Sequence, residues 1–174
     1  MSHIPKPNDN IAEYTLFLWQ MEDLLRAFKF NIEAIEQHYL IPNFENEIDQ
    51  RRLKELLIGL LEGMKTQEEL VAHSPYTQES MEILEKMHAY LRDDEENKEY
   101  IKMVRDCDDI VAEFLAKKSE ERQLPFTQIA INILYGVLTL KLRKMDISPA
   151  TQEAADKVKK PLIFLSQKFK ELNA

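Results

Sequence analysis

The stretch NIAEYTLFLWQMEDLLRAFKFNIEAIEQHY, residues 10–39, decides the fold class. Its apolar side chains recur at alternating steps of three and four residues, which places them along one side of an α-helix. This stripe consists of Ile11, Tyr14, Leu18, Met21, Leu25, Phe28, Ile32, Ile35 and Tyr39. We therefore predict one long helix, which ends near Ile41 because Pro42 disfavours helical geometry at the residue before it.

The same helix carries a second apolar face. Leu16, Trp19 and Phe30 point away from the main stripe. A helix that is apolar on two sides needs two neighbours, or one neighbour and a partner chain. The stretch PFTQIAINILYGVLTLKLRKM, residues 125–145, is apolar around most of its circumference. We expect these two helices to lie at the centre of the fold.

Four further helices are predicted, over about 45–72, 75–92, 98–119 and 149–172. Ser74 and Ser148 each precede a proline, the arrangement of a capping residue followed by the first helical position. Pro161 lies in phase with the last apolar stripe and predicts a kink rather than a break. The expected fold is all-α, a single bundle of about six helices. Residues 1–9 are predicted to be a flexible lead to one domain over 1–174.

Composition excludes several function classes. The chain has 174 residues, of which 44% are hydrophobic and 31% charged, as in an ordinary globular protein. The net charge of −8 repels phosphate backbones, so we expect no nucleic-acid binding. No apolar stretch reaches the roughly 20 residues of a membrane span. The single cysteine, Cys107, fits a reducing compartment, and the N-terminus lacks a signal-peptide layout. We expect a cytoplasmic protein.

The sequence offers little catalytic chemistry. Glu85 and His88 form one Glu-x-x-His pair, whereas a two-metal site in a helical bundle needs two, so we expect no metal and a half-exposed His88. Asp106 and Asp108 flank Cys107, and their charge raises a thiol pKa, which favours a small buried side chain over a nucleophile. A glycine-rich phosphate loop is missing. No cofactor or catalytic residue is predicted, which favours a non-enzymatic role.

One polar grouping lies on the first helix. Glu22 and Arg26 stand four residues apart, and Trp19 precedes Arg26 by seven. In one interpretation this is an ion pair on a solvated face, with the indole covered by a neighbouring helix. In the other it is a surface hot spot, since Trp and Arg are enriched where partner proteins anchor.

A second polar grouping lies on the helix predicted at 125–145. Gln128, Asn132, Tyr135, Thr139 and Arg143 form a narrow strip, and Gly136 beside it leaves room for another backbone to approach. One interpretation is an internal seam, because polar groups on so apolar a helix must find hydrogen-bond partners. The other is a ligand pocket lined by Asn132, Tyr135 and Arg143.

The segments 10–14, 19–20, 22–23, 26–28 and 32–35, together with 134–138 and 140–143, resemble an uncharacterised family of bacterial helical proteins of similar length, known only as a domain of unknown function. The resemblance is closest in the helices predicted at 10–39 and 125–145. It implies an all-α fold and supports these two helices as the family's signature. It implies no activity, cofactor or catalytic residue.

Three hypotheses for function follow. The first is a non-enzymatic bundle that acts through protein–protein contact, above all self-association, because Leu16, Trp19 and Phe30 need cover. The second is a small-molecule binder or enzyme with a pocket between the two central helices, in which Glu22 serves as a base. The third is contact with a basic protein through the acidic surface.

Overall fold

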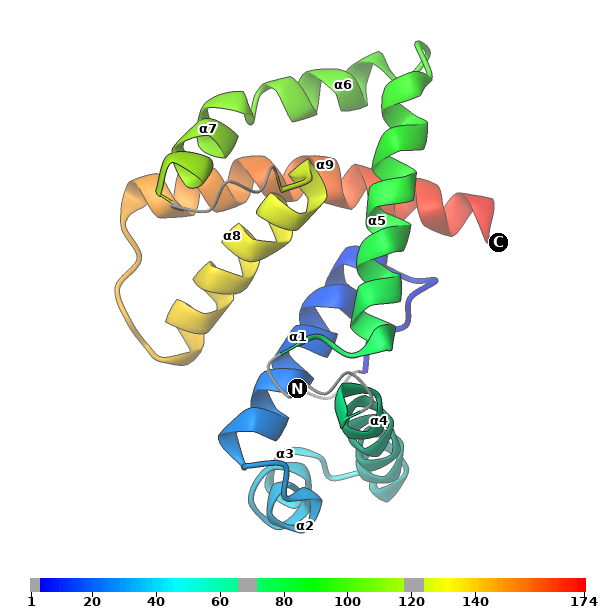
Figure 1. The fold of residues 1–174 in the computed structure, drawn as a ribbon, viewed down its shortest axis with the longest axis vertical. Helices are drawn as coiled ribbons and strands as arrows, with labels where there is room; N and C mark the ends of the chain where they lie inside the picture. Colours follow the sequence, from blue (N-terminus) through cyan, green and yellow to red (C-terminus); the bar gives the residue numbers. More distant parts are fainter. Residues whose placement is uncertain (1–3, 66–71, 118–123) are drawn as a thin grey trace. The chain divides into compact units, whose positions relative to one another are not determined.

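A computed structural model describes residues 4–65, 72–117 and 124–174, and the regular elements in these ranges are all helices (Figure 1). The all-α prediction is confirmed. Within these residues no helix is both long and apolar enough to cross a bilayer. The helices are α1 (Ile11–Ala27), α2 (Ile32–Ile35), the π-helical η1 (Glu36–Leu40), α3 (Ile41–Asn43), α4 (Glu47–Lys65), α5 (Pro75–Asp93), α6 (Lys98–Arg105), α7 (Asp108–Lys117), α8 (Phe126–Leu142) and α9 (Pro149–Leu172).

The chain divides into two compact units. The first comprises residues 1–7 and 13–80, and the second comprises 8–12 and 81–174. The expectation of about six helices was too low, because two of the predicted helices are interrupted. The two helices expected as one central pair belong to different units from residue 13 onward, so each is described within its own unit. The prediction of a single domain stays a prediction.

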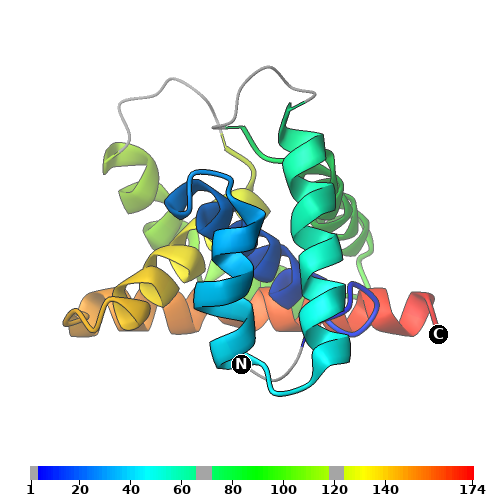
Figure 2. The same cartoon turned by 90° about the horizontal axis from the view of Figure 1, so that it is seen from below.

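The first unit is built around one apolar cluster. The stripe predicted on residues 10–39 supplies much of it, and α4 supplies the rest. The segment α2–η1–α3 and helix α4 form a hairpin, joined by residues 44–46 (Figure 2). Ile4 packs against this core and Pro5 is buried. The flexible lead over 1–9 stays a prediction. The core consists of Phe17, Leu18, Met21, Leu25, Ile35, Leu40, Phe44, Leu53, Leu57, Leu60, Leu61 and Met64.

The long helix predicted over residues 10–39 is interrupted after Ala27. Lys29 and Phe30 take positive φ values of 51° and 62°, and the Phe30 N–H donates to the Leu25 carbonyl at 2.7 Å, a bond that closes the helix end. The Asn31 side chain then caps α2 by accepting from the Ala34 N–H at 2.9 Å. A left-handed conformation costs roughly 1–2 kcal/mol at each non-glycine residue. Packing of Phe30 against the core offsets this cost.

The next helical stretch ends after Asn43, slightly beyond the predicted end. Before it, the Ile41 N–H donates to the Glu36 carbonyl five residues back, as a π-helix requires. This wider turn leaves room for the ring of Pro42, which has no N–H and would crowd the carbonyl of a regular turn. Phe44 is extended, with a φ of −131°, and is buried.

Gly63 allows α4 to pack closely against the beginning of α5. A Cβ atom at residue 63 would lie 2.8 Å from Cδ of Pro75 and 3.5 Å from Cβ of Ser74. Helix α4 continues through Gly63 to Lys65; residues 66–71, also predicted as helix, lie outside the described residues.

We predict that Gly63→Ala destabilises the protein by about 1–3 kcal/mol, because the rigid ring of Pro75 cannot move away from the added methyl group. Gly59→Ala is the matched control. Its Cβ would meet only Tyr76, at 3.8 Å, so the better helix propensity of alanine should stabilise by about 0.5–1 kcal/mol. Urea unfolding measures both changes. Equal effects of the two substitutions would contradict this interpretation.

The second unit consists of the rest of α5 followed by α6, α7, α8 and α9. Helix α9 packs against α6 and α8 along its buried stripe. It begins at Ser148, whose hydroxyl accepts from the Thr151 N–H at 3.1 Å, and it continues through Pro161 as predicted. The helix predicted over 98–119 divides at Asp106 and Cys107. Charges explain this division, because basic residues end α6 and acidic residues begin α7, as the helix dipoles favour.

His88 is buried rather than half-exposed, with 8% of its surface accessible. Its Nδ1 lies 2.7 Å from the hydroxyl of the fully buried Tyr100, and its ring stacks on Phe126 at 5.3 Å between centroids. Tyr100 in turn contacts the ring of Phe164. Burial, with a smaller contribution from the charge of Arg92, lowers the pKa of His88 from 6.5 to about 4. The fold therefore holds this imidazole neutral.

This pKa predicts an acid-sensitive stability. Because the folded pKa lies below the unfolded one, the unfolded chain takes up the proton first, and stability falls as the pH drops from 6.5 towards 4. The loss should reach roughly 3 kcal/mol, at about 1.4 kcal/mol per pKa unit. Denaturation at several pH values should show this slope in the wild type and in His38→Gln, an exposed control, and a smaller one in His88→Gln. An unchanged slope in His88→Gln would contradict the assignment.

Candidate functional site

The carboxylate of Glu22 is fully buried in the first unit and is bound from the start of α5. Its Oε1 accepts hydrogen bonds from the Ser74 N–H at 2.8 Å and from the Thr77 hydroxyl at 2.6 Å. Its Oε2 lies 2.5 Å from Nδ1 of His73. Since a carboxylate only accepts, Nδ1 carries the proton in this contact.

Arg26 completes the network. Its guanidinium lies 3.7 Å from Glu22, is bonded to Asp23 at 2.8 Å and donates to the Ala72 carbonyl at 3.2 Å. The ion pair predicted between Glu22 and Arg26 is therefore present. The solvated face predicted for it is wrong at Glu22, because the segment 72–77 covers that carboxylate.

The position of Glu22 explains its charge. Ser74 caps α5 by accepting from the Thr77 N–H at 3.4 Å, so Glu22 lies beside the N–H groups and the positive dipole end of this helix. Burial alone would raise the pKa of Glu22. The hydrogen bonds from His73, Thr77 and the Ser74 N–H outweigh burial, and together with the charge of His73 they lower this pKa. The network fastens α1 to the beginning of α5, which favours a structural role over that of a base.

Trp19 is also buried, with 7% of its surface accessible, and its indole stacks on the His73 ring at 4.7 Å and 21°. Phe30 packs against the core of the first unit, and Leu16 is half-buried. The apolar face that motivated self-association through the first helix is thus largely covered by the chain itself. Trp19 does not present the exposed anchor that a hot spot requires.

Glu22→Gln should destabilise the protein by about 2–4 kcal/mol, because an amide cannot accept from all the donors that surround this position and would place its own N–H₂ against some of them. Asp23→Asn, one residue away on the exposed side, should change stability by less than about 1 kcal/mol. Denaturant unfolding at neutral pH measures both. Similar losses in the two variants would show that the buried network contributes little.

The polar strip of α8 is not gathered into one pocket. The Asn132 amide donates to the Gln128 carbonyl at 2.8 Å, and the Thr139 hydroxyl donates to the Tyr135 carbonyl at 2.9 Å. Both bonds stay within the helix. Tyr135 is half-buried, and Arg143 is exposed beyond the end of α8.

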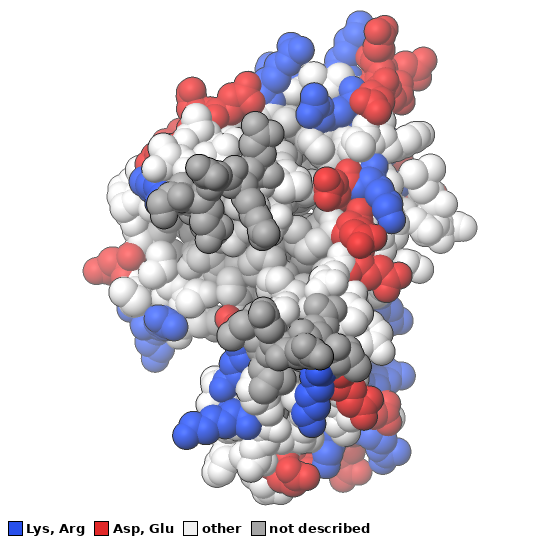
Figure 3. Space-filling view, in the orientation of Figure 1, with Lys and Arg blue, Asp and Glu red and all other residues white. Residues whose placement is uncertain are grey.

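Arg143 belongs to a basic end of α8. Lys141, Arg143 and Lys144 are all exposed there, and Figure 3 shows Lys and Arg side chains gathered over this end. Cations at a helix C-terminus interact favourably with its dipole, which accounts for these charges structurally.

A groove in the second unit contains one of the predicted site residues, Asn132. It has a volume of about 650 Å³ and lies among α7, α8 and the first turns of α9. Its lining is mainly apolar on α7 and α8, whereas small residues of α9 form the other side. The lining residues are Ile110, Glu113, Phe114, Lys117, Asn132, Ile133, Gly136, Val137, Thr139, Leu140, Ser148, Ala150, Thr151 and Ala154.

Gly136 lies in this groove, and a Cβ atom at this position would meet no atom within 4 Å among the described residues. The chain's own packing therefore gives no reason for a glycine here, although glycine in a helix costs about 1 kcal/mol relative to alanine. The room that the sequence suggested for another backbone is present, and no described residue fills it.

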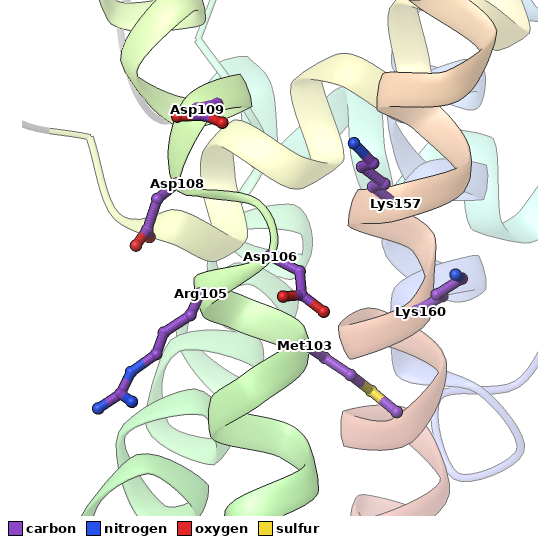
Figure 4. Close-up of a pocket in the computed structure, with 7 residues that line it drawn as sticks. All are labelled: Met103, Arg105, Asp106, Asp108, Asp109, Lys157 and Lys160. Atoms are coloured by element: carbon purple, nitrogen blue, oxygen red, sulfur yellow. The ribbon is translucent and has the colours of Figure 1, made fainter.

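A second cleft, of about 540 Å³, lies between the junction of α6 with α7 and helix α9. It is lined by Met103, Arg105, Asp106, Asp108, Asp109, Lys157 and Lys160. Figure 4 shows that these side chains do not converge: Asp106 and Met103 point towards α9, whereas Arg105 and Asp108 point away from it and Lys160 points away from the α6–α7 junction. Such an arrangement does not build a binding site for one ligand.

Cys107 lies at the same junction and is fully buried. Its thiol donates to the Met103 carbonyl at 3.3 Å. Burial, followed by the charges of Asp106 and Asp108, raises its pKa to about 11, in the direction that the sequence predicts. Among the described residues, no three His, Cys, Asp or Glu side chains are grouped so that they would hold a metal ion.

A family model described as "Domain of unknown function (DUF4924)" matches residues 4–174. The chain belongs to this DUF4924 family. The resemblance seen in the sequence is thereby confirmed. No curated protein and no solved structure matches the chain.

The DUF4924 description assigns no activity to its members. Sequence reasoning singled out Asn132 and Gly136 but missed Phe114, Ile133 and Leu140, which line the groove beside them. It also missed His73 and Thr77 as partners of Glu22. The signal available for the groove was Gly136 itself, a poor helix former within an apolar helix.

Proposed function

We propose that this protein is non-enzymatic and acts through contact with another protein chain, in the first place a second copy of itself. The supporting observation is the apolar groove of the second unit, with Gly136 open on α8. Apolar grooves of this kind receive the apolar face of a helix, and covering the groove removes its side chains from water.

The alternative, a small-molecule or enzymatic site, has less support. Glu22 and Arg26 are engaged by each other and by the segment 72–77, and Asn132 is bonded to its own helix. Arg143 lies exposed at the basic end of α8. Glu22, Arg26 and Asn132 already bind other parts of the chain. The groove, by contrast, has apolar surface that no described residue covers.

A cytoplasmic location belongs to the same proposal. A single cysteine, buried and without a disulfide partner in its own chain, fits a reducing compartment. The family resemblance supports a bacterial origin. Neither nucleic acid nor membrane is proposed as a partner, because a net charge of −8 repels both phosphate backbones and anionic lipid.

We predict that the wild-type protein self-associates and that Gly136→Glu abolishes this. The substitution places a charge on the groove, removes no core contact and improves helix propensity, so the fold should be retained. Ala112→Glu adds the same charge at an exposed position of α7 outside the groove and should associate as the wild type does. Size-exclusion chromatography with light scattering over a concentration series measures the mass of each.

As a control, the unfolding midpoints of Gly136→Glu and Ala112→Glu test whether both variants are folded. A wild type that remains monomeric throughout the concentration series would refute self-association. A folded Gly136→Glu protein that associates as strongly as the wild type would refute the role of the groove.

A further inference from the structure

Residues 28–31 join α1 to α2 in a strained turn, at which the chain changes direction (Figure 1). Lys29 and Phe30 both have positive φ values, of 51° and 62°. Neither residue is a glycine, and the left-handed conformation is unfavourable for residues that carry a Cβ atom. Consecutive residues of this kind persist only where the surrounding structure holds them in place. The turn is therefore under conformational strain.

The sequence of this turn fits a continuous helix. Steps of three and four residues lead from Leu25 through Phe28 to Ile32, so the apolar stripe keeps its phase across the turn. The N–H groups of residues 29–31 already donate to backbone carbonyls, and in a helix each would donate to the carbonyl four residues back. The first N–H groups of α2, which have no acceptor within that helix, would gain one. Conversion of the turn to helix thus relieves the strain without loss of a backbone hydrogen bond.

The turn is also the covalent link between an N-terminal arm, residues 4–27, and the rest of the chain. Leu18 and Leu25 of the arm belong to the same buried cluster as the apolar side chains of α4. Glu22 of the arm accepts a hydrogen bond from the Ser74 N–H at the start of α5. If the turn becomes helical, the arm leaves these contacts, and the surface that it uncovers fits the arm of another copy in every contact.

We infer that two copies of the chain can exchange their N-terminal arms, with residues 28–31 converted from turn to helix in each copy. Every contact that the arm makes within one chain is then made with the other chain, and the turn alone differs. Because the arm must first detach, the exchange proceeds through partly unfolded protein and is slow. It uses no residue of the groove around Gly136, so it goes beyond the proposed function and does not depend on it.

The test begins with refolding of the Gly136→Glu variant from urea, because this background removes the proposed association at the groove. Refolding at high protein concentration should produce a dimer that persists after dilution. Refolding at low concentration should produce the monomer. Size-exclusion chromatography with light scattering measures the ratio of dimer to monomer.

Substitutions at Lys29, which is exposed, test whether strain in the turn drives the exchange. In the same background, Lys29→Gly relieves the strain of the turn and disfavours the helix, so it should lower the ratio of dimer to monomer at least about tenfold. Lys29→Ala is the matched control, since alanine keeps the strain and favours the helix. It should form at least as much dimer as the background. Equal ratios for the two variants would overturn the inference.

Cross-linking identifies the contact that is exchanged. Nζ of Lys170 lies 3.8 Å from the Asp9 carboxylate of the arm, and both side chains are exposed. With Asp9→Cys and Lys170→Cys in the Gly136→Glu background, a short bismaleimide should join two chains in the exchanged dimer but should link each monomer only to itself. Cys107 is fully buried and should not react. A denaturing gel separates the two products.

A dimer that cross-links only within each chain would show association through another surface and would overturn the exchange of arms. A Gly136→Glu protein that stays monomeric in every refolding would also overturn it, and the proposed role of the groove would survive. A wild type that stays monomeric in native solution would instead overturn the proposed function and leave the exchange to be decided by refolding.

Discussion

This structure depends on one constraint: the apolar side of each helix must be covered by another surface. Every helix of the chain must place its apolar side chains against another surface, because burial of such surface drives folding. In the first unit, α1 is covered on one side by α4 and the segment α2–η1–α3, and Trp19 is covered on another by His73. Some apolar side chains of this unit stay exposed, among them Ile41 and Ile48. In the second unit the groove beside α8 and the end of α9 remain incompletely covered.

Glu22 shows how a charge can be buried in the same fold. An isolated carboxylate in an apolar interior would be costly, yet this one lies where the first turn of α5 supplies N–H and hydroxyl donors and a favourable dipole. The same group that looked like a surface ion pair, or a catalytic base, instead fastens two helices. Glu22 thus contributes to the position at which α5 begins, through its bonds to Ser74 and Thr77, rather than to a binding site.

The sequence predicted what depends on local periodicity and local capping. The all-α class, the helices at Pro75–Asp93 and Pro149–Leu172, and the cap at Ser148 follow from spacing and from residue types within a few positions. The interruption at Lys29 and Phe30 was missed because neither residue is a glycine or a proline, and the apolar period continues through it. The signal was Asn31, a capping residue in the middle of an apparently continuous helix. The burial of Glu22 and His88 was missed because it depends on segments more than ten residues away in the chain, which periodicity does not reveal.

Hydroxyl-radical footprinting across a concentration series measures most directly whether the open surface of the second unit is where this protein meets another chain. If it is, Phe114 and Leu140 react with the radical in dilute solution and become protected as concentration rises. Tyr90, which is 54% exposed on α5, should react equally at every concentration. Constant reactivity of all three side chains, from the most dilute to the most concentrated sample, would contradict the central claim.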